Sequence, residues 1–326
     1  EQGLGSFDSL LRATTVDPAM LVWLSGNENT KWAPNENYGR ELMELFTLGV
    51  SDGSGYPYSE DDVREQARAL TGWTSEWDDN LGPVNFHFDA SLHDKKNKTI
   101  FGHTGNWDWQ DSCRLVLNHD AHRPYFVNRL WRHFIPTAPS QPTLDGLVAL
   151  YESSGRQIRP VVEAILMHPQ LYTGQALVKP PVVFIVGMLK ARKRYIDTDA
   201  WAWITELAGQ RPFDPPNVSG WDETRWLDTS TLRGRWTAVA QTVEPDEVSD
   251  KGDYPDPKEN PQQALDRALR FWGHPPLSNP TRKELLRFGK QVEAAIVADW
   301  ERKTFRALRQ NALRVLIATS PDLETS

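Results

Sequence analysis

The segment from Asn35 to Gly49 holds the densest set of residue types that could do chemistry. Its polar positions follow the i, i+3, i+4, i+7 spacing of one helix face, and they are Asn37, Arg40, Glu41 and Glu44. Two carboxylates one helical turn apart, with an amide beside them, can hold a cation or act as general acid and base. The alternative is a surface ion pair between Arg40 and Glu44, which would have no functional role.

Histidine is concentrated in one part of the chain. Six of the eight histidines fall between residues 87 and 133: His87, His93, His103, His119, His122 and His133. His93 and Asp94 place an imidazole beside a carboxylate, and both groups are metal ligands. No pair of histidines has a zinc-type spacing on one helix face, so the pattern alone does not define a metal site.

Two tryptophans supply candidate walls for such a site. Trp73 follows a helix that contains Arg68, a cation expected near the carboxylates. Trp221 ends a Pro/Gly-rich stretch within residues 210–226, and Asn217 precedes it. Loops of this length are usually functional or act as ordered braces, so the stretch is either a pocket wall or a rigid brace.

Helices must position most of these residues. Asn35 can cap the first segment and Gly49 can end it, while Ser59 and Asp62 have the spacing of a capping box. A Gly-rich turn is expected at 51–55 between the two helices. Further helical periodicity covers residues 4–13, 18–24, 109–116, 127–134, 144–153, 160–167, 181–193, 199–208, 264–273, 281–300 and 303–319. The helix over 181–193 is apolar nearly all round and is expected to be central and buried.

One segment departs from the helical period. Phe86 and Phe88 alternate with polar residues, which is typical of a strand, and residues 99–102 could return as its partner after a polar turn. The expected fold is therefore mostly α, a multi-helix orthogonal bundle with one small β-hairpin near 85–102. We expect a main helical domain over 1–243, an acidic Pro-rich linker or insertion over 244–262, and C-terminal helices over 263–326 that pack back on the main domain.

Composition excludes several classes of function. The net charge is −8, from 36 basic and 44 acidic residues, and no basic stripe with aromatics occurs, which argues against nucleic-acid binding. No apolar run reaches the roughly 18 residues that a transmembrane helix needs. The one cysteine, Cys113, lies on an apolar helical face and is expected in the core.

The same segments resemble a known family. The matching stretches are NENYGRELMELFTLG (35–49), YSEDDV (58–63), ARALTGW (67–73), His93-Asp94 with Lys98 and Gly102, KPP (179–181) and PPNVSGW (215–221). They occur in the order typical of the domain-of-unknown-function 1800 family, and the resemblance runs from about residue 4 to residue 321. His119 and His122 lie in a helix junction, so we expect them to be solvated or capping residues. The chain departs from the family pattern there, so we do not count them as site residues.

The resemblance implies a bacterial protein, exported or periplasmic, often encoded beside a protein of the domain-of-unknown-function 1501 family. Members usually begin with a further N-terminal portion containing a Trp-His-x-His-Phe-like segment, so we interpret this sequence as an N-terminally truncated member. The resemblance implies no particular reaction.

Two functions are consistent with these observations. The first is a helical accessory protein that binds a neighbouring exported enzyme. The alternative is a metal-assisted hydrolase in which Glu41 or Glu44 is the base, His93 and Asp94 bind a divalent metal ion, and Trp73 and Trp221 form the walls. A cluster bearing a metal would favour the hydrolase, and carboxylates engaged in ion pairs beside a large exposed apolar patch would favour the accessory protein.

Overall fold

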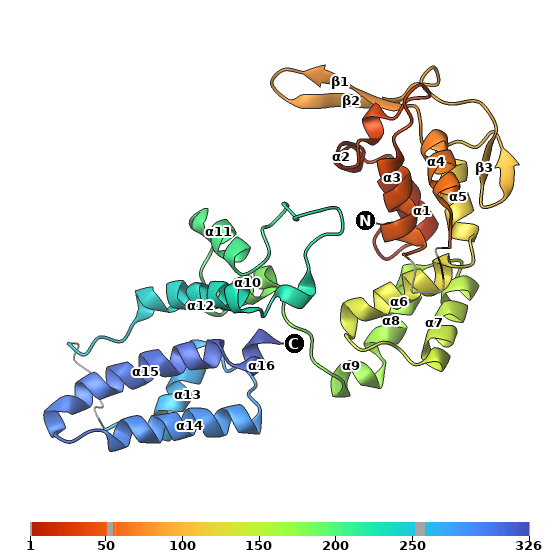
Figure 1. Ribbon diagram of the computed structural model, residues 1–326. Coiled ribbons are helices and arrows are strands. Elements are labelled where there is room, and N and C mark those ends of the chain that lie inside the picture. Colours follow the sequence, from red (N-terminus) through yellow and green to blue (C-terminus); the bar gives the residue numbers. More distant parts are fainter. Residues whose placement is uncertain (1, 51–54, 56, 252–257, 326) are drawn as a thin grey trace. The chain divides into compact units, whose positions relative to one another are not determined.

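The computed structural model describes residues 2–50, 55, 57–251 and 258–325 of the chain. Within these residues it contains sixteen α-helices and two small two-stranded sheets, which confirms a mostly α fold (Figure 1). The chain forms two compact units, Glu1–Gln175 and Ala176–Ser326. The Gly-rich turn expected at 51–55 lies outside the described residues, apart from Gly55.

The first unit contains nine α-helices and both sheets among its described residues. In chain order the elements are α1 (Phe7–Thr15), α2 (Pro18–Trp23), η1 (Gly26–Glu28), α3 (Glu36–Glu41), η2 (Leu42–Thr47), α4 (Glu60–Ala69), β1 (Trp73–Asp78), β2 (Gly82–Phe88), β3 (Lys98–Ile100), β4 (His103–Gly105), α5 (Trp109–Asn118), α6 (His122–Phe134), α7 (Gln141–Ser153), α8 (Ile158–Leu166) and α9 (Pro169–Thr173). Its buried side chains include Leu11, Leu42, Val63, Val116, Val127, Trp131 and Ile165, and Cys113 is buried as expected.

The helix expected over 35–49 is two helices of different pitch. Asn35 caps α3 by accepting a hydrogen bond from the Asn37 N–H at 2.9 Å, and Gly49 follows the helical segment at φ +85°, as expected. Between them, however, η2 is a π-helix, a conformation that is rare and frequent at functional sites. The wider turn changes which side chains face the core, so the i, i+4 spacing does not hold across the whole segment.

Close helix packing fixes α3 against α4. A Cβ on Gly39 would lie 3.0 Å from the Ala67 backbone nitrogen and 3.3 Å from the Val63 carbonyl oxygen, so only glycine permits this approach. Helix α4 begins with the expected capping box of Ser59 and Asp62. The sequence therefore identified the start of α4 correctly.

The predicted hairpin region holds two hairpins with different partners from those expected. Strand β2 contains Phe86 and Phe88 but pairs antiparallel with β1, with Phe88 opposite Trp73. Residues 98–100 form β3, which pairs with β4 instead of returning to β2. The reason is the Asp78 side chain, which accepts hydrogen bonds from the Asn80 and Leu81 N–H groups and stabilises a tight turn directly before β2.

The second unit is entirely helical in its described part. Its elements are α10 (Pro181–Ala191), α11 (Ala200–Leu207), η3 (Glu223–Arg225), α12 (Thr229–Val243), η4 (Glu244–Asp246), α13 (Pro261–Phe271), α14 (Asn279–Ala294), η5 (Asp299–Glu301), α15 (Arg302–Ala318) and α16 (Pro321–Glu324). Helices α10 and α15 both pack on α12. The three-segment division at 243 and 262 stays a prediction of domain organisation.

Helix α10 is less buried than its composition suggested. One face contributes Phe184, Ile185 and Leu189 to the core, but Val183 and Val186 are 54% and 43% exposed. Apolar residues all round a helix therefore do not make it central here. Of the helices that the structure describes, none is both long and apolar enough to cross a membrane.

Candidate functional site

Asp94 is the centre of a hydrogen-bonded cluster at the end of α4. Its carboxylate accepts a hydrogen bond from Arg68 Nε at 2.8 Å and another from the Lys96 N–H at 2.8 Å. Arg68 also pairs with Glu65 at 2.7 Å. Burial alone would raise the pKa of Asp94, but the hydrogen bonds from Arg68 and Lys96 outweigh it and lower the pKa. Asp94 is thus an ionised carboxylate held by cations of the protein.

Lys98 completes this cluster from β3. Its side chain is fully buried, and its Nζ donates hydrogen bonds to the carbonyl oxygens of Asp94 and Trp107, the latter at 2.7 Å. Burial lowers the pKa of Lys98. Lys98 thereby connects the loop after His93 to the segment before α5. This contact explains, in structural terms, why a lysine suits this position of the motif.

His93 is buried beside the same cluster. Its Nδ1 lies 2.9 Å from the Thr71 carbonyl oxygen, so Nδ1 carries the proton and donates to it. Its ring centroid is 5.7 Å from that of Phe88, and burial lowers the pKa of the imidazole. The structure therefore brings Arg68, His93 and Asp94 together, with His93 neutral and oriented by the backbone.

The carboxylates of the α3–η2 segment lie elsewhere. Arg40 forms ion pairs with Glu60 at 2.7 Å and with Glu36 at 3.3 Å, so the ion pair expected between Arg40 and Glu44 is replaced by these two. Glu41 is only 9% exposed, and burial, followed by the charge of Glu44, raises its pKa. Glu41 is the more unusual of the two carboxylates.

Helix α4 separates these two groups. Arg40 is paired near the start of α4, at Glu60, while Asp94 is paired with Arg68 near its end. These positions are eight residues apart, or about 12 Å along a helix axis. No three His, Cys, Asp or Glu side chains of the described chain come close enough together to hold a metal ion. Within the described residues, Glu41, Glu44, His93 and Asp94 therefore do not form one metal-binding cluster.

The other predicted site residues of the first unit make contacts with residues outside the predicted set. Asn37 is exposed, and its Nδ2 reaches the Leu24 carbonyl oxygen at 3.4 Å. Trp73 is half-buried and packs edge-on against Phe88 and Trp109, each at 5.9 Å between ring centroids.

Asn217 and Trp221 belong to the second unit, whereas Trp73 belongs to the first. Asn217 is exposed and accepts a hydrogen bond from the Ser219 N–H at 2.9 Å, while Trp221 is half-buried. The choice between pocket wall and rigid brace for this loop stays open.

The π-helix η2 is braced by α6. Its geometry leaves carbonyl oxygens for side chains, and Tyr125 Oη donates to the carbonyl of Leu45 at 2.9 Å while Arg129 donates to the same oxygen. His122 bridges the Thr47 carbonyl and the Tyr151 hydroxyl, each at 3.1 Å.

Burial lowers the pKa of His122 to about 4. His122 is therefore a neutral core residue rather than a solvated one, which corrects the sequence-based expectation. His119 is the C-cap residue of α5, and in the turn before α6 its Nδ1 accepts a hydrogen bond from the Ala121 N–H at 3.2 Å.

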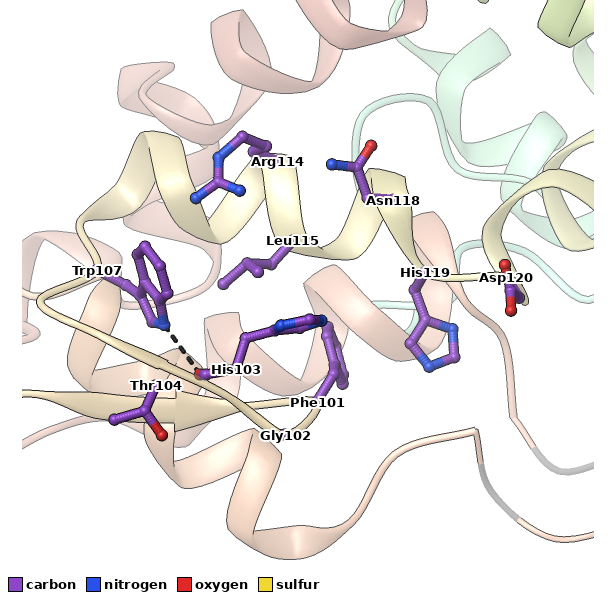
Figure 2. A pocket seen from close by; sticks show the side chains of 10 residues that line it. All are labelled: Phe101, Gly102, His103, Thr104, Trp107, Arg114, Leu115, Asn118, His119 and Asp120. Carbon is purple, nitrogen blue, oxygen red and sulfur yellow. Dashed lines mark hydrogen bonds between the residues drawn. The ribbon is translucent and has the colours of Figure 1, made fainter.

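A polar cleft that the sequence did not predict lies beside α5 (Figure 2). It has a volume of about 670 Å³ and is lined by Phe101, Gly102, His103, Thr104, Trp107, Arg114, Leu115, Asn118, His119 and Asp120. Arg114 stacks over Trp107 at 5.3 Å, and Trp107 Nε1 donates to the His103 carbonyl oxygen at 3.1 Å. The concentration of histidines between 87 and 133 was the one sequence signal for this cleft.

The most exposed apolar side chains of the first unit include those of the β1–β2 hairpin. Trp77 is 74% exposed and Leu81 is 77% exposed, at the end of a hairpin that projects from the helices of its unit (Figure 1). Each strand pairs only with the other in the described residues, so both outer edges lack a strand partner. We call residues 73–88 the aromatic arm.

Comparison with known proteins identifies the family of this chain. The model of the family described as "Protein of unknown function (DUF1800)" matches residues 1–324, and the chain belongs to this family. No curated protein and no solved structure matches the chain.

Proposed function

We propose that this chain is a non-catalytic binding protein that attaches to a protein partner through the aromatic arm. The observation that carries the proposal is the exposure of Trp77 and Leu81, at 74% and 77%. Large apolar side chains at the end of a projecting hairpin are costly in water, and they are typical of surfaces that another protein covers.

The backbone of the arm supports a protein partner over a small molecule. An isolated two-stranded hairpin is marginally stable in water, and an unpaired edge can accept a further strand. Strand addition would extend the β1–β2 sheet, while Trp77 and Leu81 would enter pockets of the partner. The acidic side chains at the tip, Glu76, Asp78 and Asp79, favour a basic surface around those pockets.

The remaining predicted site residues are consistent with an accessory role. Arg40 and Arg68 are both engaged in ion pairs with carboxylates, and Asp94 and His93 are held by internal hydrogen bonds. The partner that the family resemblance implies is the neighbouring exported enzyme, a protein of the domain-of-unknown-function 1501 family. We also propose that the complex is exported, as the family resemblance implies.

The test is binding between this chain and the purified neighbouring protein of the domain-of-unknown-function 1501 family, measured by calorimetry. We expect a 1:1 complex that the double variant Trp77→Ala, Leu81→Ala weakens by about 100-fold or more, since two buried anchors are lost. The matched control is Trp300→Ala, which removes an equally exposed tryptophan (79%) from the second unit. No complex, or equal weakening by Trp300→Ala, would overturn the proposal.

The second candidate is the metal-assisted hydrolase with Glu41, Glu44, His93 and Asp94, which would require these side chains to move together around a metal ion. The burial and the raised pKa of Glu41 favour it, because a buried carboxyl beside a second carboxylate suits proton transfer. Metal analysis of the intact protein, followed by Glu41→Gln and His93→Ala, tests it. A stoichiometric metal lost in His93→Ala would support this candidate; no metal, with both variants retaining every measured property, would reject it.

A further inference from the structure

Helix α15 in the second unit places arginine side chains in the interior. Arg306 and Arg309 are 2% and 3% exposed, and Gln310 between the same helices is fully buried. The helix packs on α13 and α14, so this polar face meets other helices and not water. Arginine is almost never fully buried unless it is paired, so these guanidinium groups need anionic partners.

Glu259 is the carboxylate that these groups share. Its Oε2 lies 3.7 Å from Arg309 and 3.9 Å from Arg306, and it accepts a hydrogen bond from Gln310 Nε2 at 3.0 Å. Its Oε1 lies 2.8 Å from Arg267 Nε. One buried carboxylate thus has three arginines around it, and the two on α15 are at distances longer than a hydrogen bond from its oxygens.

A cavity of about 260 Å³ opens beside this cluster. Its charged lining consists of Lys258, Glu259, Glu293, Arg302, Arg306 and Arg309. Four cationic side chains therefore face two carboxylates, and the remaining wall is apolar. The volume is below the roughly 300 Å³ at which pockets for drug-sized molecules begin, so the cavity suits a small ion or group.

Arg309 lines this cavity, and one of its N–H donors is not used in a hydrogen bond. One of its terminal nitrogens donates to the Glu259 carbonyl oxygen, but its buried Nε has no hydrogen-bond acceptor among the described residues. A buried donor left without an acceptor costs free energy, and a buried charge costs more. Burial also lowers the pKa of Arg309, in agreement with a guanidinium that its surroundings solvate poorly.

We propose that this cavity binds a phosphate group, either free phosphate or the terminal group of a phosphate monoester. Tetrahedral phosphate oxygens match the planar fork of a guanidinium, and a phosphate oxygen supplies the acceptor that the buried Arg309 Nε lacks. Arg309 Nε donates to one oxygen, and Arg302 at the cavity rim contacts another. The site belongs to the second unit and is independent of the aromatic arm.

Calorimetry with inorganic phosphate on the full chain tests this site, at constant ionic strength with chloride as the balancing anion. We expect one saturable site per chain and, in Arg309→Gln, binding weaker by about tenfold or more, because a charged donor is lost. The matched control is Arg287→Gln, since Arg287 is 66% exposed on α14 and pairs with Glu284. Its phosphate affinity should equal that of the wild type.

Two further variants keep the test decisive if Arg309→Gln does not fold. Arg309→Lys keeps the charge but removes the fork, and Arg302→Gln removes a cation at the rim, where the side chain is 38% exposed. Each should weaken phosphate binding about threefold or more while circular dichroism remains that of the wild type. Absence of saturable binding to the wild type, or unchanged binding by both folded variants, would overturn the proposal.

The source of the phosphate group is distinguished in the same experiment. Glycerol 3-phosphate is titrated beside inorganic phosphate. Tighter binding of the ester assigns the cavity to the end of a larger ligand, whereas tighter binding of inorganic phosphate assigns it to the free ion. If neither saturates the site, the proposal is rejected.

Discussion

Each unit of this protein has a buried cluster in which arginines lie beside a carboxylate. The two clusters differ in how completely their hydrogen-bond donors are satisfied. In the first unit, Asp94 receives Arg68 and a backbone N–H at 2.8 Å each, and Arg68 is also paired with Glu65. In the second unit, Glu259 is shared by several arginines, of which Arg309 lies 3.7 Å away. Both clusters border a cavity, but Arg68 and Asp94 pair with each other, whereas the buried Arg309 Nε of the second cluster has no acceptor among the described residues.

The difference separates architecture from binding. A carboxylate whose hydrogen-bonding capacity is met internally holds a loop in place, and nothing is gained by adding a ligand. A guanidinium whose buried donor has no acceptor gains from any anion that can reach it. Arginines beside carboxylates are therefore informative only when donors and acceptors are matched one by one.

The largest expected effect is that of Glu259→Gln. Removing the carboxylate that Arg309 faces should destabilise the protein by about 3–5 kcal/mol, because the buried Arg309 charge then loses the Glu259 carboxylate. Phosphate should stabilise this variant by about 2.7 kcal/mol at 100 times its dissociation constant. At the same phosphate concentration the wild type should gain less, because the Glu259 carboxylate repels the anion and weakens its binding. Urea unfolding with and without phosphate measures both effects. Failure of phosphate to stabilise Glu259→Gln more than the wild type would remove the distinction between the clusters.

The pH dependence of stability provides the second test. The buried imidazole of His122 in the first unit satisfies its hydrogen-bond partners in its neutral form. The pKa of His122 is lowered to about 4, whereas an unfolded histidine titrates near 6.5. As the pH falls from about 6.5 to about 4, the unfolded chain takes up a proton that the folded chain excludes, so stability decreases by about 3 kcal/mol in total. His122→Gln should flatten the dependence of stability on pH over this interval; an unchanged slope contradicts the assignment.

A smaller effect is expected for Asp94→Asn. The amide keeps the shape but loses the charge-assisted bond from Arg68, and Arg68 retains Glu65, so the loss should be about 2 kcal/mol. Phosphate should stabilise this variant no more than it stabilises the wild type. A specific rescue by phosphate would mean that the first cluster also binds anions.

The smallest effect is that of Arg64→Ala. Arg64 and its partner Asp61 are 58% and 82% exposed, so solvent screens their interaction. The midpoint of thermal unfolding should not change measurably. A clear decrease would show that exposed pairs on α4 contribute as the buried ones do, which would weaken the comparison.

Local signals in the sequence predicted much of the secondary structure. The caps at Asn35 and Ser59, the end at Gly49 and the mostly α class are confirmed, because capping and helical periodicity depend on residues within one or two turns. The pairing of β2 was wrong, since the turn at Asp78 brings β1 to it. The π-helix η2 was also not predicted, because Tyr125 and Arg129 brace it from a helix about 80 residues later in the chain.

Contacts between residues far apart in the chain limited the prediction of the candidate site even more than that of the secondary structure. By itself the sequence determined which residue types were available: His93 beside Asp94, the carboxylates of 35–49, and the arginines of 302–314. Only the tertiary structure decided that Asp94 pairs with Arg68, that Glu41 is buried, and that Arg309 lines a cavity. The physical reason is that charge compensation depends on atoms a few ångströms apart, and those atoms come from segments far apart in the chain.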